Sequence, residues 1–266
     1  MLKIESLNDG FDGANEKLAP DGVANHDSGE ANTGDAVGDT VANAEHYWTV
    51  TRLAPGVRDQ NRVNVFLDGK FAFSLDVAQV VDLEVKVGQK LDAERLQALQ
   101  CASEFGKLYQ RTLEWVLTRP HSVQETRDYL KRRKFKRQML NRQRVRDEKR
   151  PLPEIQDDIA AQVLERLTER GYLDDLKFAR YFVENRNARK GTSLKRLRME
   201  LKQKGVSEGQ IQAALDEIPR DENAEMRKII AKKRKKYDDQ KLIAYLARQG
   251  FEFSAAKAAV EEYGQD

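Results

Sequence analysis

The sequence has few of the residues from which catalytic and metal sites are built. Its 266 residues include one cysteine and three histidines, at positions 26, 46 and 121. Zinc sites with ordinary ligand spacing and an intrachain disulfide are therefore excluded, and a Cys/His or Ser/His/Asp nucleophile has almost no residues to draw on. The phosphate-binding pattern GxxxxGK[ST] is also missing, which argues against ATP hydrolysis. We expect a protein without enzymatic activity and without a cofactor.

Long apolar runs are missing as well. No stretch of eighteen or so apolar residues occurs, and residues 1–6 show no basic segment followed by an apolar one. We therefore expect neither export nor membrane insertion. The single cysteine, Cys101, suits a reducing compartment, so the sequence predicts a cytoplasmic protein.

Proline is scarce, with six residues, whereas charged residues make up 34% of the chain. Most of these charged residues are good helix formers, and β-branched residues gather only near residues 48–87. The composition therefore predicts a mainly α fold with a largely charged surface.

Charge is distributed unevenly along the chain. Residues 1–46 contain ten acids against Lys3 and Lys17, and because the formal net charge of the chain is +3, the remainder carries +11. A body this basic favours a polyanionic partner, nucleic acid above all, over a membrane. The acidic segment alternates Gly, Ala, Asn and Asp, so residues 1–46 are expected to form a disordered tail. The tail either solubilises the protein or competes with DNA for the basic body.

Residues 47–92 predict a small β-hairpin subdomain. Two β-prone runs, 63–67 and 71–75, are separated by the pair Asp68-Gly69. This pair suits a type I′ turn, in which both residues take positive φ, and the turn would place Phe66 opposite Phe71.

An internal repeat organises the helical remainder. The segment LKQKGV at 201–206 recurs as LARQGF at 246–251 and, more weakly, as LKRRKF at 130–135. Each copy is expected to end one helix before the next begins, with Asp174, Ser193 and Ser207 as helix caps. The fold class that follows is an elongated array of three three-helix repeats, preceded by the β-hairpin element and the tail. The repeats are expected at 93–170, with a basic insertion at 136–153, at 174–218 and at 221–266.

Three pairs of neighbouring acids allow two interpretations. They are Asp157-Asp158, Asp174-Asp175 and Asp238-Asp239. A metal-dependent nuclease would need such carboxylates, but each pair lies at or within the first turn of a predicted helix. Carboxylates there accept bonds from free backbone N–H groups and complement the helix dipole, so capping is the simpler interpretation and no metal is expected.

Basic residues gather in three places. Lys195, Arg198 and Lys202 fall at i, i+3 and i+7 of one predicted helix, and residues 131–150 contain eleven Lys and Arg against two acids. Lys and Arg also suit helix C-termini, so a binding surface and a merely solvated one both fit these patterns. The candidate partner-binding or DNA-binding residues are Arg186, Arg189, Lys190, Lys195, Arg198, Lys202, Lys131, Arg132, Arg133, Arg137, Arg142, Arg144, Lys232, Lys233 and Lys236.

Several motifs resemble the RecX family: GYLDDLKFAR at 171–180, LKQKGV at 201–206 and IQAAL at 211–215, with further agreement at 113–122 and in LDGKFAF at 67–73. The resemblance is strongest in residues 154–218 and weaker in the third repeat. The resemblance spans about residues 47–263, and the acidic tail and the basic insertion depart from the family pattern. It implies a monomeric regulator that binds the RecA filament and its single-stranded DNA, directly or within the filament. The resemblance implies that such a regulator inhibits the RecA ATPase and strand exchange or promotes disassembly of the filament, in homologous recombination, DNA repair and the SOS response.

A stand-alone DNA-binding protein, architectural or transcriptional, is the alternative. The two helices expected between residues 193 and 215 could form a helix-turn-helix. The return of the same pair of helices in the third repeat favours the repeat array.

Overall fold

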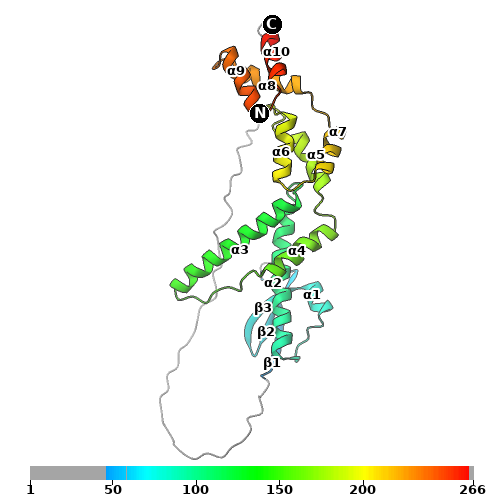
Figure 1. Ribbon diagram of the computed structural model, residues 1–266. Helices are drawn as coiled ribbons and strands as arrows, with labels where there is room; N and C mark the ends of the chain where they lie inside the picture. Colours follow the sequence, from blue (N-terminus) through cyan, green and yellow to red (C-terminus); the bar gives the residue numbers. More distant parts are fainter. Residues whose placement is uncertain (1–45, 58, 264–266) are drawn as a thin grey trace, which may run out of the picture. The chain divides into compact units, whose positions relative to one another are not determined.

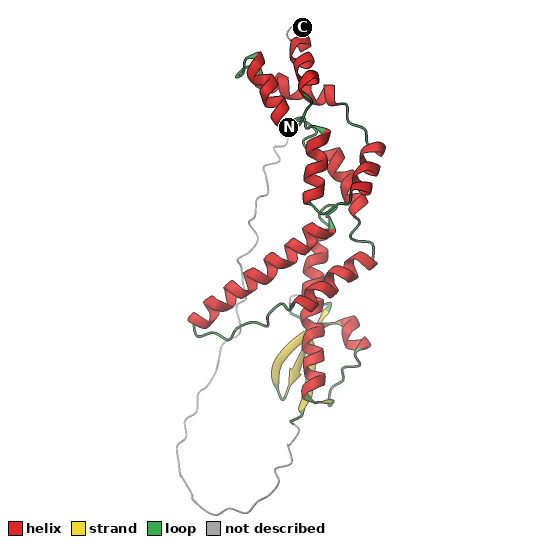
Figure 2. Cartoon of the chain, in the orientation of Figure 1, coloured by secondary structure: helices red, strands yellow, loops and turns green. Residues whose placement is uncertain are grey.

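The computed structural model describes residues 46–57 and 59–263. The expected disordered tail, residues 1–46, lies outside this part except for His46. Within it, a small sheet is followed by a succession of helices (Figures 1 and 2), which confirms the mainly α fold with an N-terminal β-hairpin element.

The sheet has the strand order β3-β2-β1-β4, and its neighbouring strands are antiparallel. Asp68 and Gly69 have φ values of 47° and 80°, and Phe66 pairs with Phe71, which confirms the hairpin turn. The sheet buries one face against Leu99 of α2. The elements are β1 (Trp48–Pro55), β2 (Arg62–Leu67), β3 (Lys70–Asp76), α1 (Val77–Asp82) and β4 (Lys90–Leu91).

Three sets of three helices follow, which we call units 1, 2 and 3. Unit 1 consists of α2 (Ala93–Val116), α3 (Val123–Arg146) and α4 (Asp157–Glu169). Unit 2 consists of α5 (Asp175–Asn185), α6 (Leu194–Gln203) and α7 (Glu208–Glu217). Unit 3 consists of α8 (Glu222–Lys233), α9 (Asp239–Arg248) and α10 (Phe253–Tyr263).

Each unit has a hydrophobic cluster of its own. Apolar residues recur three and four positions apart on these helices, and those faces meet inside each set of three. The buried side chains at the centres are Val163 and Leu167 in unit 1, Phe178, Leu197 and Ile211 in unit 2, and Ile230, Leu246 and Val260 in unit 3. Burying one such side chain contributes roughly 1.5–3 kcal/mol, so each unit has a core that fixes its three helices.

The expected caps are present. The Asp174 carboxylate accepts hydrogen bonds from the backbone N–H groups of Leu176 and Lys177, and Ser193 Oγ accepts one from the N–H of Arg196. Ser207 Oγ accepts one from Gln210 within a capping box. These caps satisfy backbone donors that have no partner inside the helix.

Helix α3 departs from the repeat pattern. The expectation that a helix ends within 130–135 is wrong, because α3 runs unbroken to Arg146. In units 2 and 3 the equivalent segments end their helices at Gly205 and Gly250, whose φ values are 79° and 96°. Unit 1 has Lys134 at this place, and a residue with a Cβ disfavours the left-handed turn that stops the other two helices.

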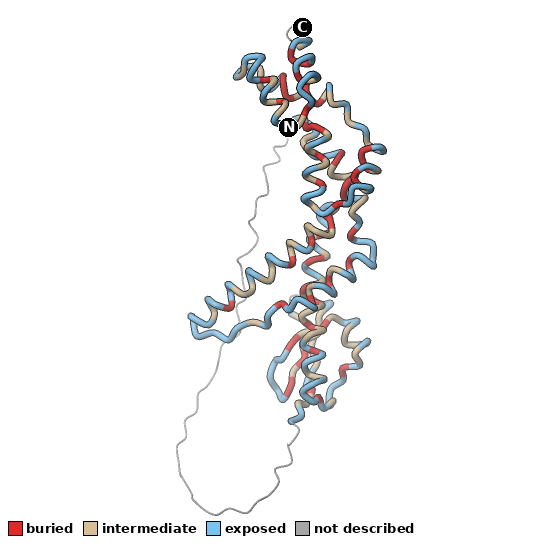
Figure 3. The backbone as a smooth tube through the Cα atoms, in the orientation of Figure 1, coloured by how far each residue is buried: buried red, intermediate tan, exposed pale blue. Residues whose placement is uncertain are grey.

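The expected basic insertion is therefore the far part of α3 followed by a segment that returns to α4. We call residues 131–146 the arm and residues 147–156 the return segment. The Asn141 side chain bonds both backbone groups of Leu152, at 2.8 and 2.9 Å, so the return segment is fixed along one side of the arm. Much of the arm's remaining surface is exposed (Figure 3).

Candidate functional site

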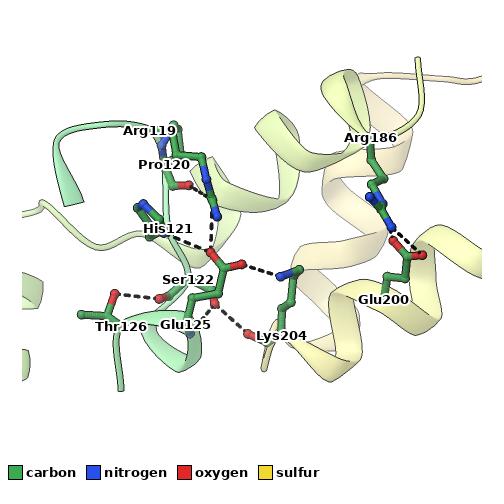
Figure 4. Close-up of polar contacts among 9 residues, drawn as sticks. All are labelled: Arg119, Pro120, His121, Ser122, Glu125, Thr126, Arg186, Glu200 and Lys204. Atoms are coloured by element: carbon green, nitrogen blue, oxygen red, sulfur yellow. Dashed lines mark hydrogen bonds and ion pairs between the residues drawn. The ribbon is translucent and has the colours of Figure 1, made fainter. Parts of the chain in front are cut away.

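Unit 1 is joined to unit 2 at the N-terminus of α3. Ser122, the N-cap of this helix, donates a 2.8 Å hydrogen bond from Oγ to the backbone carbonyl of Lys204, beside the end of α6 (Figure 4). The next backbone N–H, of Val123, donates to the Asp175 carboxylate at 2.9 Å. The first turn of α3 is thus bonded both to the start of α5 and to the end of α6.

Unit 2 is joined to unit 3 by the same contacts. Ser193, the N-cap of α6, donates from Oγ to the carbonyl of Gln249 at 2.7 Å, and the N–H of Leu194 donates to the Glu222 carboxylate at 3.0 Å. Gln249 has the same place in LARQGF as Lys204 has in LKQKGV. The internal repeat therefore encodes one type of junction that is used twice.

A partly buried carboxylate lies at the first junction. Glu125 is bonded by Arg119 at 3.1 Å, by the His121 imidazole at 3.2 Å and by the Lys204 ammonium (Figure 4). Burial alone would raise the pKa of Glu125, but these three hydrogen bonds hold it well below its usual range. Glu125 therefore remains ionised and binds the two units together electrostatically.

The second junction has a buried carboxylate of its own, Glu225 on α8. It accepts a hydrogen bond from the backbone N–H of Thr192 at 2.9 Å and forms ion pairs with Arg220 at 2.9 Å and Lys228 at 2.7 Å. Burial opposes its ionisation, yet these partners lower the pKa of Glu225 below its ordinary value. Both junctions are thus held by a carboxylate that stays charged.

A cleft of about 730 Å³ opens beside the first junction, and aromatic and charged side chains line it. Trp115, Tyr181 and Phe182 supply its aromatic rings. Arg186 forms a bidentate pair with Glu200, at 2.6 and 3.1 Å (Figure 4), and this pair raises the pKa of Arg186. Predicted residues Arg186 and Arg132 both lie here.

A second cleft, also of about 730 Å³, lies beside the second junction. The structure brings Lys195, Arg198 and Lys202 together on its wall. Glu208, at the start of α7, pairs with Arg198 at 3.1 Å and with Lys202 at 2.6 Å, so it neutralises part of this charge. Four predicted residues of unit 2 are therefore divided between two clefts, with Arg186 in the first and the other three in the second.

The other predicted residues of units 2 and 3 lie apart from these clefts. Arg189 and Lys190 are exposed in the turn before α6, where the Lys232 ammonium donates to the Arg189 carbonyl at 2.5 Å. The Lys233 ammonium lies over the rings of Tyr237 and Tyr245, 5.8 and 5.4 Å from their centroids, and Lys236 is exposed.

The predicted residues of the arm point in different directions. Arg137 donates to the Pro153 carbonyl at 2.7 Å, and Arg144 donates to the Arg150 carbonyl at 2.8 Å, so both hold the return segment. Arg133 lies over the Tyr129 ring, whereas Lys131, Arg132 and Arg142 are exposed.

The sequence analysis missed Glu125, Lys204 and Arg119. Their contacts join residues as far as 82 positions apart, beyond the reach of local periodicity. The sequence did contain one signal of these junctions. A serine precedes both α3 and α6, and a polar residue, Lys204 or Gln249, precedes the glycine of the repeated segment in units 2 and 3.

Neither a metal site nor a membrane span is found in the part of the chain that the structure describes. No three or more His, Cys, Asp and Glu side chains are grouped there so that they could hold a metal ion. None of its helices is both long and apolar enough to cross a bilayer.

Comparisons with known proteins point to one family. Residues 174–215 match the family model described as RecX, second three-helix domain, and residues 49–92 match the regulatory protein RecX N-terminal domain. The regulatory protein RecX of Bacillus subtilis (strain 168) is 28% identical over 227 residues, which cover 82% of this chain and 78% of that protein. The RecX of Halalkalibacterium halodurans is 30% identical over 190 residues, 70% of this chain and 64% of that protein.

The fold has a counterpart among solved structures. The crystal structure of a regulatory protein RecX superposes with a TM-score of 0.60 at 20% identity and covers 80% of this chain and 99% of that one. At this identity the likeness concerns the arrangement of the helices and the sheet.

Proposed function

The chain belongs to the RecX family of regulatory proteins, and from this premise we propose that it binds the RecA recombinase filament on single-stranded DNA and inhibits its ATPase and strand exchange. A regulator that acts by binding needs no nucleophile, metal or phosphate loop. The described clefts are lined by cations, aromatic rings and paired carboxylates, which suit recognition of a charged surface.

The repeated junction is the observation that supports this proposal most. The same serine-to-carbonyl contact joins units 1 and 2 and units 2 and 3, and a charged cleft lies beside each. A chain that presents similar sites at successive places is suited to a partner that also repeats, as a protein filament does. Several weak contacts then act together and give avidity.

The second cleft brings together three cations of unit 2, and Glu222 and Glu252 also line it. Lys195, Arg198 and Lys202 lie on one wall, and Glu208 pairs with Arg198 and Lys202. These cations suit either the phosphates of the DNA or an acidic surface of RecA. They are the first residues to change in a functional test.

RecA-driven strand exchange, measured with substoichiometric amounts of the purified protein, tests the proposal. We expect the parental chain to inhibit the reaction and the double variant K195E/K202E to inhibit it markedly less. A matched control, K241E/K257E, makes the same change of charge at exposed positions of unit 3 and should inhibit like the parent.

Unimpaired strand exchange in the presence of a chain that still binds DNA would reject the proposal. It would favour the alternative, a stand-alone DNA-binding protein. Equal loss of inhibition in both double variants would reject the second cleft as the contact surface.

A further inference from the structure

One aromatic side chain of the arm, Phe135, is exposed, whereas the side chains at the equivalent position of the other two repeats are buried. Leu130, Leu201 and Leu246 begin the three copies of the repeated segment, and all three are buried. At the sixth position, Val206 and Phe251 are each 4% exposed, but Phe135 is 61% exposed. The difference arises because α3 continues past Lys134 and carries Phe135 away from the core of unit 1.

Phe135 belongs to a row of side chains on the side of the arm that faces away from the return segment. We define the arm stripe as Arg132, Phe135, Met139, Arg142 and Arg146, which follow one another at intervals of three and four residues. Residues so spaced share one face of a helix. All five side chains are exposed. Asn141, which holds the return segment, points to the opposite side.

The cations of the arm stripe have no carboxylate partner among the described residues, in contrast to other cations of α3. Lys134 pairs with Asp157 at 2.7 Å, and Arg137 lies 3.8 Å from Glu104. Arg142 instead contacts the Met139 sulfur at 3.9 Å. The stripe thus combines uncompensated positive charge with an exposed aromatic ring over about 21 Å of helix.

We infer that the arm stripe is a binding surface for single-stranded DNA. A base stacks on the Phe135 ring, and Arg132, Arg142 and Arg146 contact the phosphates on either side of it. Single-stranded nucleic acid offers an aromatic face and a regularly charged backbone together, and sites that bind it combine aromatic side chains with cations. The inference rests on the function proposed above, because it names the DNA-contacting surface of a protein that acts on a DNA-bound filament.

Two other occupants fit the stripe less well. A second copy of the arm would bring the three arginines of each stripe into one interface, and their repulsion opposes a paired helix. Duplex DNA satisfies the arginines but keeps its bases stacked, so it leaves the Phe135 ring exposed. An acidic protein surface would likewise pair with the arginines and leave the Phe135 ring without a partner.

Binding of the full chain to a labelled oligo-dT strand and to a labelled duplex, without RecA, tests the inference. We expect F135L to weaken binding to the single strand about fivefold or more and to leave duplex binding unchanged. We expect R142E/R146E to weaken binding to both and to flatten the salt dependence for the single strand by about 1.4 units of slope. V145A, which truncates an exposed apolar side chain of the arm outside the stripe, and K241E/K257E are the controls.

A second readout is the fluorescence of F135W, which we expect to be quenched, relative to the parental protein, when oligo-dT is added. An unchanged single-strand affinity for F135L together with unquenched F135W emission would overturn the inference. A weakening by V145A equal to that by F135L would do the same. Because RecA is absent, these outcomes are independent of whether the protein inhibits strand exchange.

Discussion

Ser193 Oγ donates a 2.7 Å hydrogen bond to the backbone carbonyl of Gln249, fifty-six residues later in the chain. The same hydroxyl accepts a hydrogen bond from the N–H of Arg196 and so caps α6. One fully buried serine therefore begins a helix and joins two units. Ser122 has both roles at the preceding junction.

Replacing this serine should cost more than the loss of an ordinary cap. S193A removes the cap and leaves the Gln249 carbonyl without its donor, so we expect a loss of about 2–4 kcal/mol in the free energy of unfolding. Ser207 caps α7 at an exposed position, and S207A should cost only about 0.5–1 kcal/mol. Urea unfolding of the two variants checks this, and equal losses would contradict the role of Ser193 in joining the units.

Glu125 should make stability depend on acid pH. Its pKa is lower in the folded protein than in the unfolded chain, because hydrogen bonds from His121, Lys204 and Arg119 outweigh burial. The folded state therefore binds fewer protons, and the stabilisation is complete above the unfolded pKa of about 4.3 and lost as pH falls below it. We expect E125Q to destabilise the protein by about 1–3 kcal/mol at pH 7.

The loss of unfolding free energy caused by E125Q, relative to the parental protein, should then depend on pH. The difference in unfolding free energy should be constant above about pH 5.5 and should shrink as the solution is acidified toward pH 3. E165Q, which changes an exposed carboxylate of α4, serves as the control. A difference between E125Q and the parent that is the same at pH 3 and pH 7 would be incompatible with the ionised Glu125 described here.

Removing Glu208, which pairs with two cations of the second cleft, should strengthen binding to a polyanion. Glu208 pairs with Arg198 and Lys202, and the hydrogen bond from Lys202 lowers the pKa of Glu208. E208Q releases both cations, so we expect a twofold to fivefold gain in affinity for DNA or for the RecA filament at low salt, roughly the free energy of an exposed ion pair. E217Q adds the same unit of positive charge elsewhere in unit 2, and a gain of equal size for both variants would speak against the cleft.

Local sequence patterns were sufficient for the hairpin turn and for three of the helix caps. The Asp68-Gly69 pair predicts the hairpin turn because few other dipeptides tolerate two positive φ values in succession. Asp174, Ser193 and Ser207 predict helix starts because their short polar side chains reach the free backbone N–H groups. Each inference needs only neighbouring residues.

The arm could not be predicted from the same patterns. LKRRKF resembles the repeat closely enough to suggest a helix end, but Lys134 replaces the glycine on which that end depends. The direction of each arginine depends on the return segment, which bonds Arg137, Asn141 and Arg144 and leaves Arg142 exposed. Composition alone does not distinguish the arginines that bond the return segment from those that are exposed.

The candidate site required the three-dimensional structure for a different reason. Lys195, Arg198 and Lys202 share a helix face, so their common wall follows from spacing. Arg186 precedes them by only nine residues but lies in the other cleft, because the turn between α5 and α6 redirects the chain. Glu125 and Lys204 meet only through the packing of unit 1 on unit 2.

Sedimentation of the protein with RecA filaments assembled on single-stranded DNA, compared with the same DNA without RecA, tests the central claim most directly. We predict that the chain pellets with the filament, that binding saturates below one chain per RecA protomer because its successive units contact neighbouring protomers, and that K195E/K202E pellets less. Retention on bare DNA with no added retention on the filament would contradict the account.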